Sequence, residues 1–391
     1  MTDDRATGRV DAWMGGPRGR RLLAEVVTAS APAEDGAPWG YPAWSLPDDP
    51  APLPDPVRAA MRDRLAAAVA ALDPAAGWVP DPRTVLPALA DSVVAARYWQ
   101  HPDREDAVLA DPEFADLLRP VAEALVAAPA CRSWSEPVDP GEQWQVRWVL
   151  RPGDRRPGPA PSTRGARETL RRLRAGEAQD EARARRERAG EVTRNWSGEW
   201  WSFPPEGGGL VATDASLPAS LAGGAAEPCP AGLVLVEDDL GAQDAWVRRV
   251  PVRDDVRVLE IRDGADWAGL VSRHPRAVTF SRRHDWYRST GWDGSWALPD
   301  WASVAEEYDG VHLTLDGYLA VSGALLTTTV PGEPAPPGAS LRAGAARTLL
   351  AGWDPGRTSW LTDVLAPHGA GAPHRWRAPG DHVGDWAPAG W

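Results

Sequence analysis

Residues 280–318 read FSRRHDWYRSTGWDGSWALPDWASVAEEYDGVHLTLDGY, and the rest of the C-terminal half is organised around this stretch. Its second half places a short helical pattern, 301–307, before a β-branched run, 311–315. Helical and extended segments that alternate in this way are typical of a sheet with helices packed on it. We therefore expect the stretch to belong to an α+β domain.

Further short runs of β-branched residues flank this stretch and predict additional strands. They lie at 233–236, 246–252, 256–261 and 277–280, separated by turn residues. A short helix is predicted at 266–273, and 349–365 is predicted as a last helix or a helix plus a strand. Many strands with few, short helices favour an α+β fold on a small, bent antiparallel or mixed sheet.

The first 150 residues carry mostly helical patterns, at about 8–29, 55–73, 83–100 and 104–128. Within the last of these, Asp111 followed by Pro112 predicts a helix start, with aspartate as N-cap and proline at the first helical position. Residues 143–150 alternate between polar and apolar types, which indicates a strand. We expect a helical N-terminal domain over 1–150.

Three further segments complete the expected organisation of the chain. Residues 151–193 form a linker rich in proline and arginine and include a charged helix, which we interpret as a solvated connection or, alternatively, a partner-binding helix. Residues 194–366 form the α+β domain that carries the candidate site. Residues 367–391 form an irregular tail rich in glycine, proline and tryptophan.

The composition excludes several classes of function. The net charge of −13 argues against a general binder of nucleic acid or of anionic membranes. The chain contains no lysine, which excludes a P-loop lysine and a lysine Schiff base. It also has no GxGxxG motif, so a Rossmann cofactor is not expected. The longest apolar run, 65–72, is too short to span a membrane.

The cysteines and the N-terminus indicate a cytoplasmic protein. Cys131 and Cys229 are isolated, so the sequence predicts neither a disulfide framework nor a cysteine metal site. The first residues lack the apolar segment of a signal peptide. In the tail, the spacing of His368, His374 and His382 matches no regular ligand pattern, and we expect no metal.

A basic cluster marks the first half of the opening stretch. Residues 272–288 hold five arginines and one acid. Arginine matches phosphate oxygens bidentately, and the adjacent Trp286 and Tyr287 offer rings for stacking, as a dinucleotide site requires. The alternative is ion pairing with the acids at 254–266 and 306–309.

A second motif, Asp309-Gly310-Val311-His312-Leu313-Thr314, resembles the last block of the SGNH hydrolases over about ten residues. In that family the aspartate orients the histidine as the base for a serine, which implies such roles for Asp309 and His312. The family's Gly-Asp-Ser and Gly-x-Asn-Asp blocks are missing from this sequence. The alternative is a turn at Asp309 followed by a histidine inside a strand.

The phrases RHDWYR, DWASVAEEYDG and GWDPGRTSWL together resemble a group of actinobacterial proteins over most of the chain. More remotely, their order resembles the ADP-ribosyltransferase-like fold, which implies NAD binding in a cleft between two small sheets. On that resemblance Arg194 or Arg282 would bind the diphosphate, with Arg283 and His284 beside them. Trp286 or Tyr287 would stack on the nicotinamide.

The same resemblance implies that Glu307 holds a ribose hydroxyl and helps an oxocarbenium-like centre to form. The Glu-x-Glu pair of that superfamily is replaced here by Glu306-Glu307. We therefore expect a cytoplasmic NAD-dependent ADP-ribosyltransferase-like enzyme with a nucleotide-like ligand. The alternatives are a non-catalytic interaction or structural protein with a protein partner, and an SGNH-like serine hydrolase.

Overall fold

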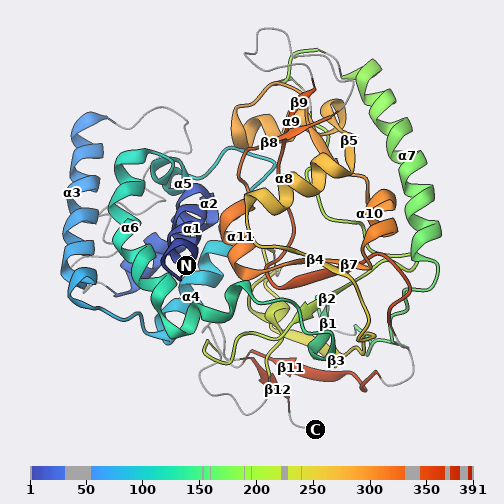
Figure 1. Cartoon of the computed structure of the whole chain (residues 1–391), viewed down its shortest axis with the longest axis horizontal. Helices are drawn as coiled ribbons and strands as arrows, with labels where there is room; N and C mark the ends of the chain where they lie inside the picture. Colours follow the sequence, from blue (N-terminus) through green and yellow to red (C-terminus); the bar gives the residue numbers. More distant parts are fainter. Residues whose placement is uncertain are drawn as a thin grey trace.

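The structure is a computed structural model, and it describes residues 2–30, 54–151, 154–158, 160–188, 190–194, 196–221, 228–238, 240–330, 344–365, 370–378 and 386–389. It combines a group of helices with a mixed sheet that carries helices of its own (Figure 1). The expected combination of helices with a mixed sheet is confirmed. The sheet is larger than expected, with eight strands in the described part of the chain.

The N-terminal helices follow the predicted patterns with two interruptions. They are α1 (Thr2–Gly15), α2 (Pro17–Ser30), α3 (Asp55–Leu72), α4 (Pro82–Val94), α5 (Arg104–Leu109) and α6 (Pro112–Ala127). The pattern at 8–29 breaks at Gly16 because Pro17 begins a new helix. The pattern at 104–128 breaks before Asp111, whose side chain accepts the Glu113 N–H at 3.0 Å; the predicted N-cap is confirmed.

The large sheet has the order β12-β11-β3-β1-β2-β10-β7-β4, and only the β4–β7 pair is parallel. Its strands are β1 (Gln143–Trp148), β2 (Val211–Ala215), β3 (Asp244–Arg249), β4 (Val258–Ile261), β7 (Gly310–Leu313), β10 (Arg357–Trp360), β11 (His374–Arg377) and β12 (Ala387–Pro388). Two-stranded sheets are formed by β5 (Pro275–Ala277) with β6 (Ala297–Pro299), and by β8 (Leu326–Thr329) with β9 (Ala345–Thr348).

This topology confirms one predicted strand and corrects other predicted elements. The strand predicted at 143–150 forms β1, and its partners β2 and β3 both lie beyond residue 150. The tail after 366, predicted to be irregular, contains β11 and β12, and β11 pairs with β3. The run at 233–236 overlaps a 3-10 turn, Ala231–Leu233, instead of a strand. The only regular element within 349–365 is the strand β10.

Five helices lie around the sheet: α7 (Ala166–Glu187), α8 (Gly264–Arg273), α9 (Thr279–Thr290), α10 (Trp301–Glu307) and α11 (Leu315–Val321). The predicted helix 301–307 is confirmed with its bounds, whereas most of the basic cluster forms α9. The charged helix α7 exposes most of its arginines, yet its Glu181 is buried and accepts the N–H groups of Phe280 and Ser281, both at 2.9 Å. Glu181 therefore anchors the first turn of α9 to α7.

The N-terminal helices and the sheet share one continuous hydrophobic core. The helix α11 joins the two halves, because its Asp316 accepts hydrogen bonds from Arg9 at 2.9 Å and from the Trp13 indole at 3.2 Å. Gly16 lies so close to the backbone of α11 that a Cβ there would overlap the carbonyl of Leu319. No helix among the described residues is long and apolar enough to cross a membrane.

Candidate functional site

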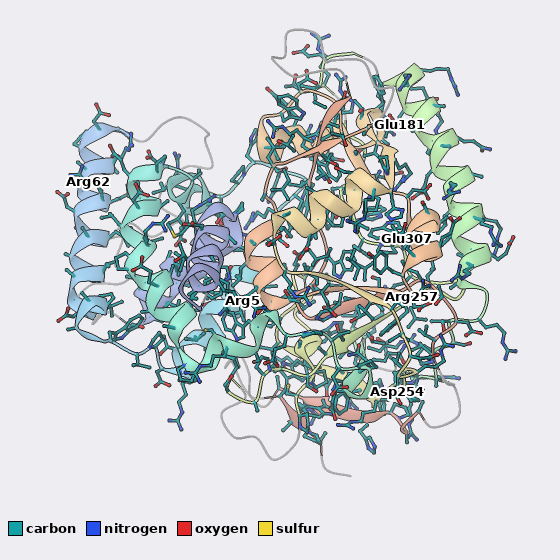
Figure 2. All side chains as sticks on the ribbon, in the orientation of Figure 1. Arg5, Arg62, Glu181, Asp254, Arg257 and Glu307 are labelled. Atoms are coloured by element: carbon teal, nitrogen blue, oxygen red, sulfur yellow. The ribbon has the colours of Figure 1, made fainter. Side chains whose placement is uncertain are left out.

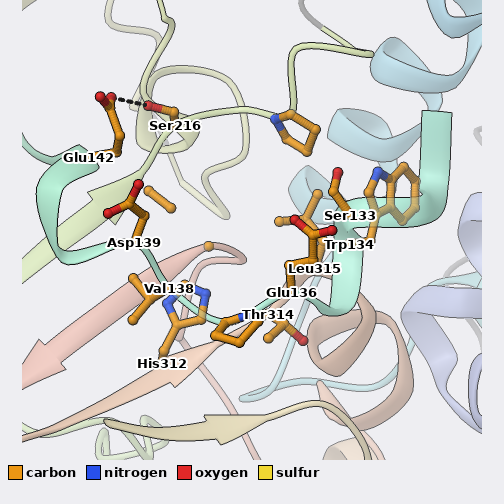
Figure 3. Close-up of a pocket in the computed structure, with 14 residues that line it drawn as sticks. Ser133, Trp134, Glu136, Val138, Asp139, Glu142, Ser216, His312, Thr314 and Leu315 are labelled. Carbon is orange, nitrogen blue, oxygen red and sulfur yellow. Dashed lines mark hydrogen bonds between the residues drawn. The ribbon is translucent and has the colours of Figure 1, made fainter. Parts of the chain in front are cut away.

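A pocket of about 230 Å³ opens beyond the carboxyl end of β7 (Figure 3). His312 comes from β7, and Thr314 and Leu315 lead into α11. The opposite wall comes from the end of β2 and the start of β10, and the segment 133–142 closes the pocket from the side. The remaining lining residues are Ser133, Trp134, Glu136, Pro137, Val138, Asp139, Glu142, Ala215, Ser216, Pro218 and Gly356.

His312 is a buried, neutral ring at the pocket wall. Its Nδ1 lies 2.8 Å from the hydroxyl of Thr358, the residue opposite it on β10. Burial lowers the pKa of His312 to about 3, and the nearby Arg262 acts in the same direction. The structure gives Nε2 no hydrogen bond to any described residue. That nitrogen is therefore the group that His312 offers to a ligand.

Glu260 stands beside His312 on the neighbouring strand. The two residues are register partners in the parallel β4–β7 pair, so their side chains leave the same face of the sheet. The Oε1 atom accepts the Val138 N–H at 3.1 Å, whereas the buried Oε2 has no partner among the described residues. Burial raises the pKa of Glu260 to about 7. A carboxyl group that titrates near neutrality thus lies behind the pocket wall.

Three carboxylates line the pocket, and none of its lining residues is an arginine. Asp139 accepts the Gly141 N–H at 2.8 Å, and Glu142 binds Arg249 at 2.5 Å and the Ser216 hydroxyl at 3.4 Å. Glu136 is exposed, and no hydrogen bond or ion pair joins it to a described side chain. Trp134, Val138 and Leu315 supply apolar walls, so the pocket combines negative charge with apolar surface.

The structure separates Asp309 from His312. The carboxylate of Asp309 accepts the Thr362 hydroxyl at 2.7 Å and the Arg257 N–H at 3.0 Å. Burial acts to raise the pKa of Asp309, but these hydrogen bonds and the Arg257 charge together lower it. Along an extended chain, side chains three residues apart leave opposite faces. The aspartate therefore stabilises the start of β7 and does not orient His312 as the hydrolase motif requires.

The predicted phosphate-binding arginines of α9 make internal contacts. Arg282 is buried, binds Glu199 at 2.5 Å and lies 5.7 Å from the centre of the Trp201 ring. Arg283 donates to the Gly190 carbonyl at 2.6 Å. The alternative prediction was ion pairing with the acids at 254–266 and 306–309. Arg282 does form an ion pair, but its partner Glu199 lies outside both of these segments. These contacts attach the segment 190–201 to α9.

The aromatic members of the cluster are similarly engaged. His284 is fully buried, with Nδ1 2.7 Å from the Val192 carbonyl oxygen and Nε2 3.3 Å from that of Arg188. Trp286 is also fully buried, and its indole donates to the Trp200 carbonyl at 2.8 Å. Neither ring presents a face to solvent for a nicotinamide. Tyr287 is half-buried on the same helix.

Arg194 and Glu307 lie on other segments. Arg194 is exposed and pairs with Glu191 at 2.7 Å. Glu307 ends α10, as Figure 2 shows, and its carboxylate lies 3.7 Å from the Nε2 atom of the buried His274. Among the described residues, no hydrogen bond or ion pair joins Arg194 or Glu307 to α9. NAD binding by this set of residues stays a sequence prediction.

The sequence motif identified His312 but paired it with Asp309, whereas its partner in the structure is Thr358. Glu260 and the segment 133–142 were not predicted as parts of the site. The available signal was an acid inside a β-branched run, VRVLEI at 256–261, because a carboxylate in a buried strand requires a partner. Within the described residues no group of three or more His, Cys, Asp and Glu side chains is placed to hold a metal. Of the three tail histidines, only His374 belongs to those residues.

Comparisons of the chain with protein families, with curated proteins and with solved structures found no match.

Proposed function

We propose that this chain is a binding protein for a small, positively charged molecule that enters the pocket at His312. The observation that carries the proposal is the unpartnered Nε2 of a buried, neutral histidine in a pocket lined by three carboxylates. The proposal belongs to the non-catalytic alternative predicted from the sequence. Both the helical half and the sheet supply residues to the pocket, so the proposal assigns binding to the two halves together.

An ammonium or guanidinium group complements this pocket. If the Nδ1–H of His312 donates to Thr358, Nε2 becomes an acceptor for an N–H of the ligand. Glu136 and Asp139 add negative potential near the opening, and hydrogen bonds to a charged donor are stronger than neutral ones. The apolar walls at Trp134 and Leu315 would contact a short carbon chain. We therefore favour an amine that carries a small apolar group.

The volume of the pocket supports a ligand of modest size. Sites for drug-sized molecules occupy roughly 300–1,000 Å³, and this pocket measures about 230 Å³. A dinucleotide is larger than a drug-sized ligand and carries negative charge, so the pocket does not suit NAD.

The predicted ADP-ribosyltransferase-like activity has a separate test, which is incubation of the protein with labelled NAD. Transfer of the label that is lost on Glu307→Gln would support that activity. The buried thiols of Cys131 and Cys229 fit the proposed cytoplasmic location.

The test is a calorimetric titration with sets of ligands that share one carbon skeleton. Each set contains an amine, the corresponding alcohol and the corresponding carboxylate. We expect binding of one or more amines and no binding of the matched carboxylates. Glu136→Gln removes one charge at the opening and breaks no hydrogen bond or ion pair to a described side chain, so it should weaken amine binding several-fold.

The matched control is Glu306→Gln, the same change at an exposed position on α10. It should leave the affinity unchanged. Equal weakening by both variants would show that only net charge matters. Carboxylates that bind as well as amines would overturn the proposal.

A further inference from the structure

A serine, a histidine and a glutamate form a chain of contacts at the other end of β7. Ser303 Oγ lies 2.9 Å from Nδ1 of His274, and Glu307 Oε2 lies 3.7 Å from Nε2 of the same ring. We infer that Ser303 is a nucleophile, that His274 is its general base and that Glu307 orients the ring. This site is independent of the ligand pocket, because α10 precedes β7 and the pocket lies beyond the end of that strand.

The backbone places the three side chains by local rules. Ser303 and Glu307 are four residues apart on α10, so they lie on the same face of that helix. His274 follows the last residue of α8, and its own N–H donates to Leu270 at 3.0 Å. The Asp300 N–H donates to the carbonyl of His274 at 2.7 Å, which joins the two elements directly.

The reaction needs the tautomer of His274 that carries its proton on Nε2. Glu307 lies 3.7 Å from this buried nitrogen without a hydrogen bond to it, and its negative charge favours the proton at that position. Nδ1 is then the acceptor, and the Ser303 hydroxyl donates to it. When the ring takes the serine proton it becomes an imidazolium, which the carboxylate stabilises. The arrangement has the logic of a serine–histidine–acid triad with the two ring nitrogens exchanged.

Ser303 and His274 are held in place before any substrate arrives. The side chain of Asp300 caps α10 by accepting the N–H groups of Ala302 at 3.1 Å and of Ser303 at 3.3 Å. Trp301 and Val304 bury the other side of the same short helix. The histidine side chain is 4% exposed and that of Glu307 is 56% exposed, so the base is shielded at the edge of an open surface. Such fixed geometry lowers the entropic cost of reaching a transition state.

The chemistry that these three groups can perform is acyl transfer from an ester. The oxygen of Ser303 would form a bond to the acyl carbon while its proton moves to His274. Collapse of the tetrahedral species breaks the ester bond, and the imidazolium returns the proton to the leaving alcohol. Water then repeats the sequence on the acyl-serine and releases the acid. No oxidant, reductant or metal is required.

The test is labelling of the full-length protein with a fluorophosphonate, followed by mass spectrometry of its peptides. In that reaction the serine oxygen displaces fluoride from phosphorus, and the base takes up the proton. We expect the label on Ser303 and its complete loss in Ser303→Ala. The matched control is Ser289→Ala, because within the described part of the chain the Ser289 hydroxyl bonds only the Trp286 carbonyl oxygen, at 3.2 Å. This control should label like the wild type.

Two further variants separate the base from its orienting group. His274→Gln should slow labelling by about 100-fold or more, which is the lower range of general-base catalysis. Because His274 is buried, Glu307→Gln at the exposed position serves as the second variant, and it should slow labelling and change its pH dependence. An unlabelled wild type, a label on another serine, or an unchanged rate in Glu307→Gln would overturn the inference.

Discussion

The close contact of Gly16 with α11 predicts that the substitution Gly16→Ala lowers the stability of the protein, because it separates the N-terminal helices from the sheet domain's α11. A Cβ added at Gly16 would lie 2.9 Å from the carbonyl carbon of Ala320 and would overlap the carbonyl oxygen of Leu319. These are backbone atoms inside a buried helix, and they have no rotamer that moves them away. The substitution Gly16→Ala must therefore shift α1 and α2 away from α11.

The expected magnitude follows from overpacking and from the bonds that the shift would stretch. Inserting a methyl group into a tightly packed interior costs about 1–3 kcal/mol, and sometimes more. The shift also lengthens the hydrogen bonds from Arg9 and Trp13 to Asp316, each worth about 1 kcal/mol or somewhat more. We expect a loss of about 2–4 kcal/mol in the free energy of unfolding.

The neighbouring residue supplies the control. Gly15 has no atom within 4 Å of an added Cβ and ends α1, so Gly15→Ala should be neutral or stabilise by up to about 1 kcal/mol. Both variants would be unfolded in urea, with far-ultraviolet circular dichroism and tryptophan fluorescence as probes. The two probes should give coincident transitions. Equal stability of the two variants would refute the packing argument, and separate transitions for helices and sheet would refute the shared core.

Two other expectations concern buried acids. Glu181→Ala should lower the free energy of unfolding by about 2–3 kcal/mol, because two N–H groups of α9 lose a charged acceptor. The control, Glu168→Ala on the exposed face of α7, should lower it by less than about 1 kcal/mol. Urea unfolding measures both variants. The raised pKa of Glu260, about 7 against 4.5, means that the folded protein holds this proton more tightly than the unfolded chain. Its carboxyl therefore destabilises the fold progressively as pH rises from about 4.5 to 7. The free energy of unfolding of Glu260→Gln should equal that of the wild type near pH 4 and exceed it by up to about 3 kcal/mol at pH 8. A stability difference that does not change with pH would contradict this assignment.

The sequence predicts elements well where the signals are local. Asp111 and Pro112 determine the start of α6 without help from distant residues, and 301–307 forms the predicted helix because Asp300 caps it. The strand at 143–148 was also visible from its alternation. Its neighbours in the sheet come from 211–215 and 244–249, and no local pattern encodes such pairing. The pairing of strands on either side of residue 150 could therefore not be predicted from the sequence.

The site was less predictable because it depends on side-chain direction. The spacing of Asp309 and His312 matched a hydrolase motif, but Asp309 precedes β7 and bonds Thr362 and the Arg257 N–H, whereas His312 bonds Thr358. The basic cluster looked like a phosphate site because its partners, such as Glu199, lie some eighty residues away. Glu260 becomes noticeable only once β4 is paired with β7. Each of these facts belongs to the tertiary structure.

The measurement that tests the central proposal most directly is the affinity of the best amine ligand for a variant whose pocket is filled. Ser133 lines the pocket, and its hydroxyl makes no hydrogen bond to a described residue, so Ser133→Phe adds a ring without removing a hydrogen bond. Ser162→Phe, at an exposed position outside the lining, is the control; among the described residues the Ser162 hydroxyl only accepts the nearby Arg164 N–H, at 3.3 Å. We expect Ser133→Phe to abolish binding measured by calorimetry and Ser162→Phe to leave it unchanged. Undiminished binding to Ser133→Phe would contradict the account.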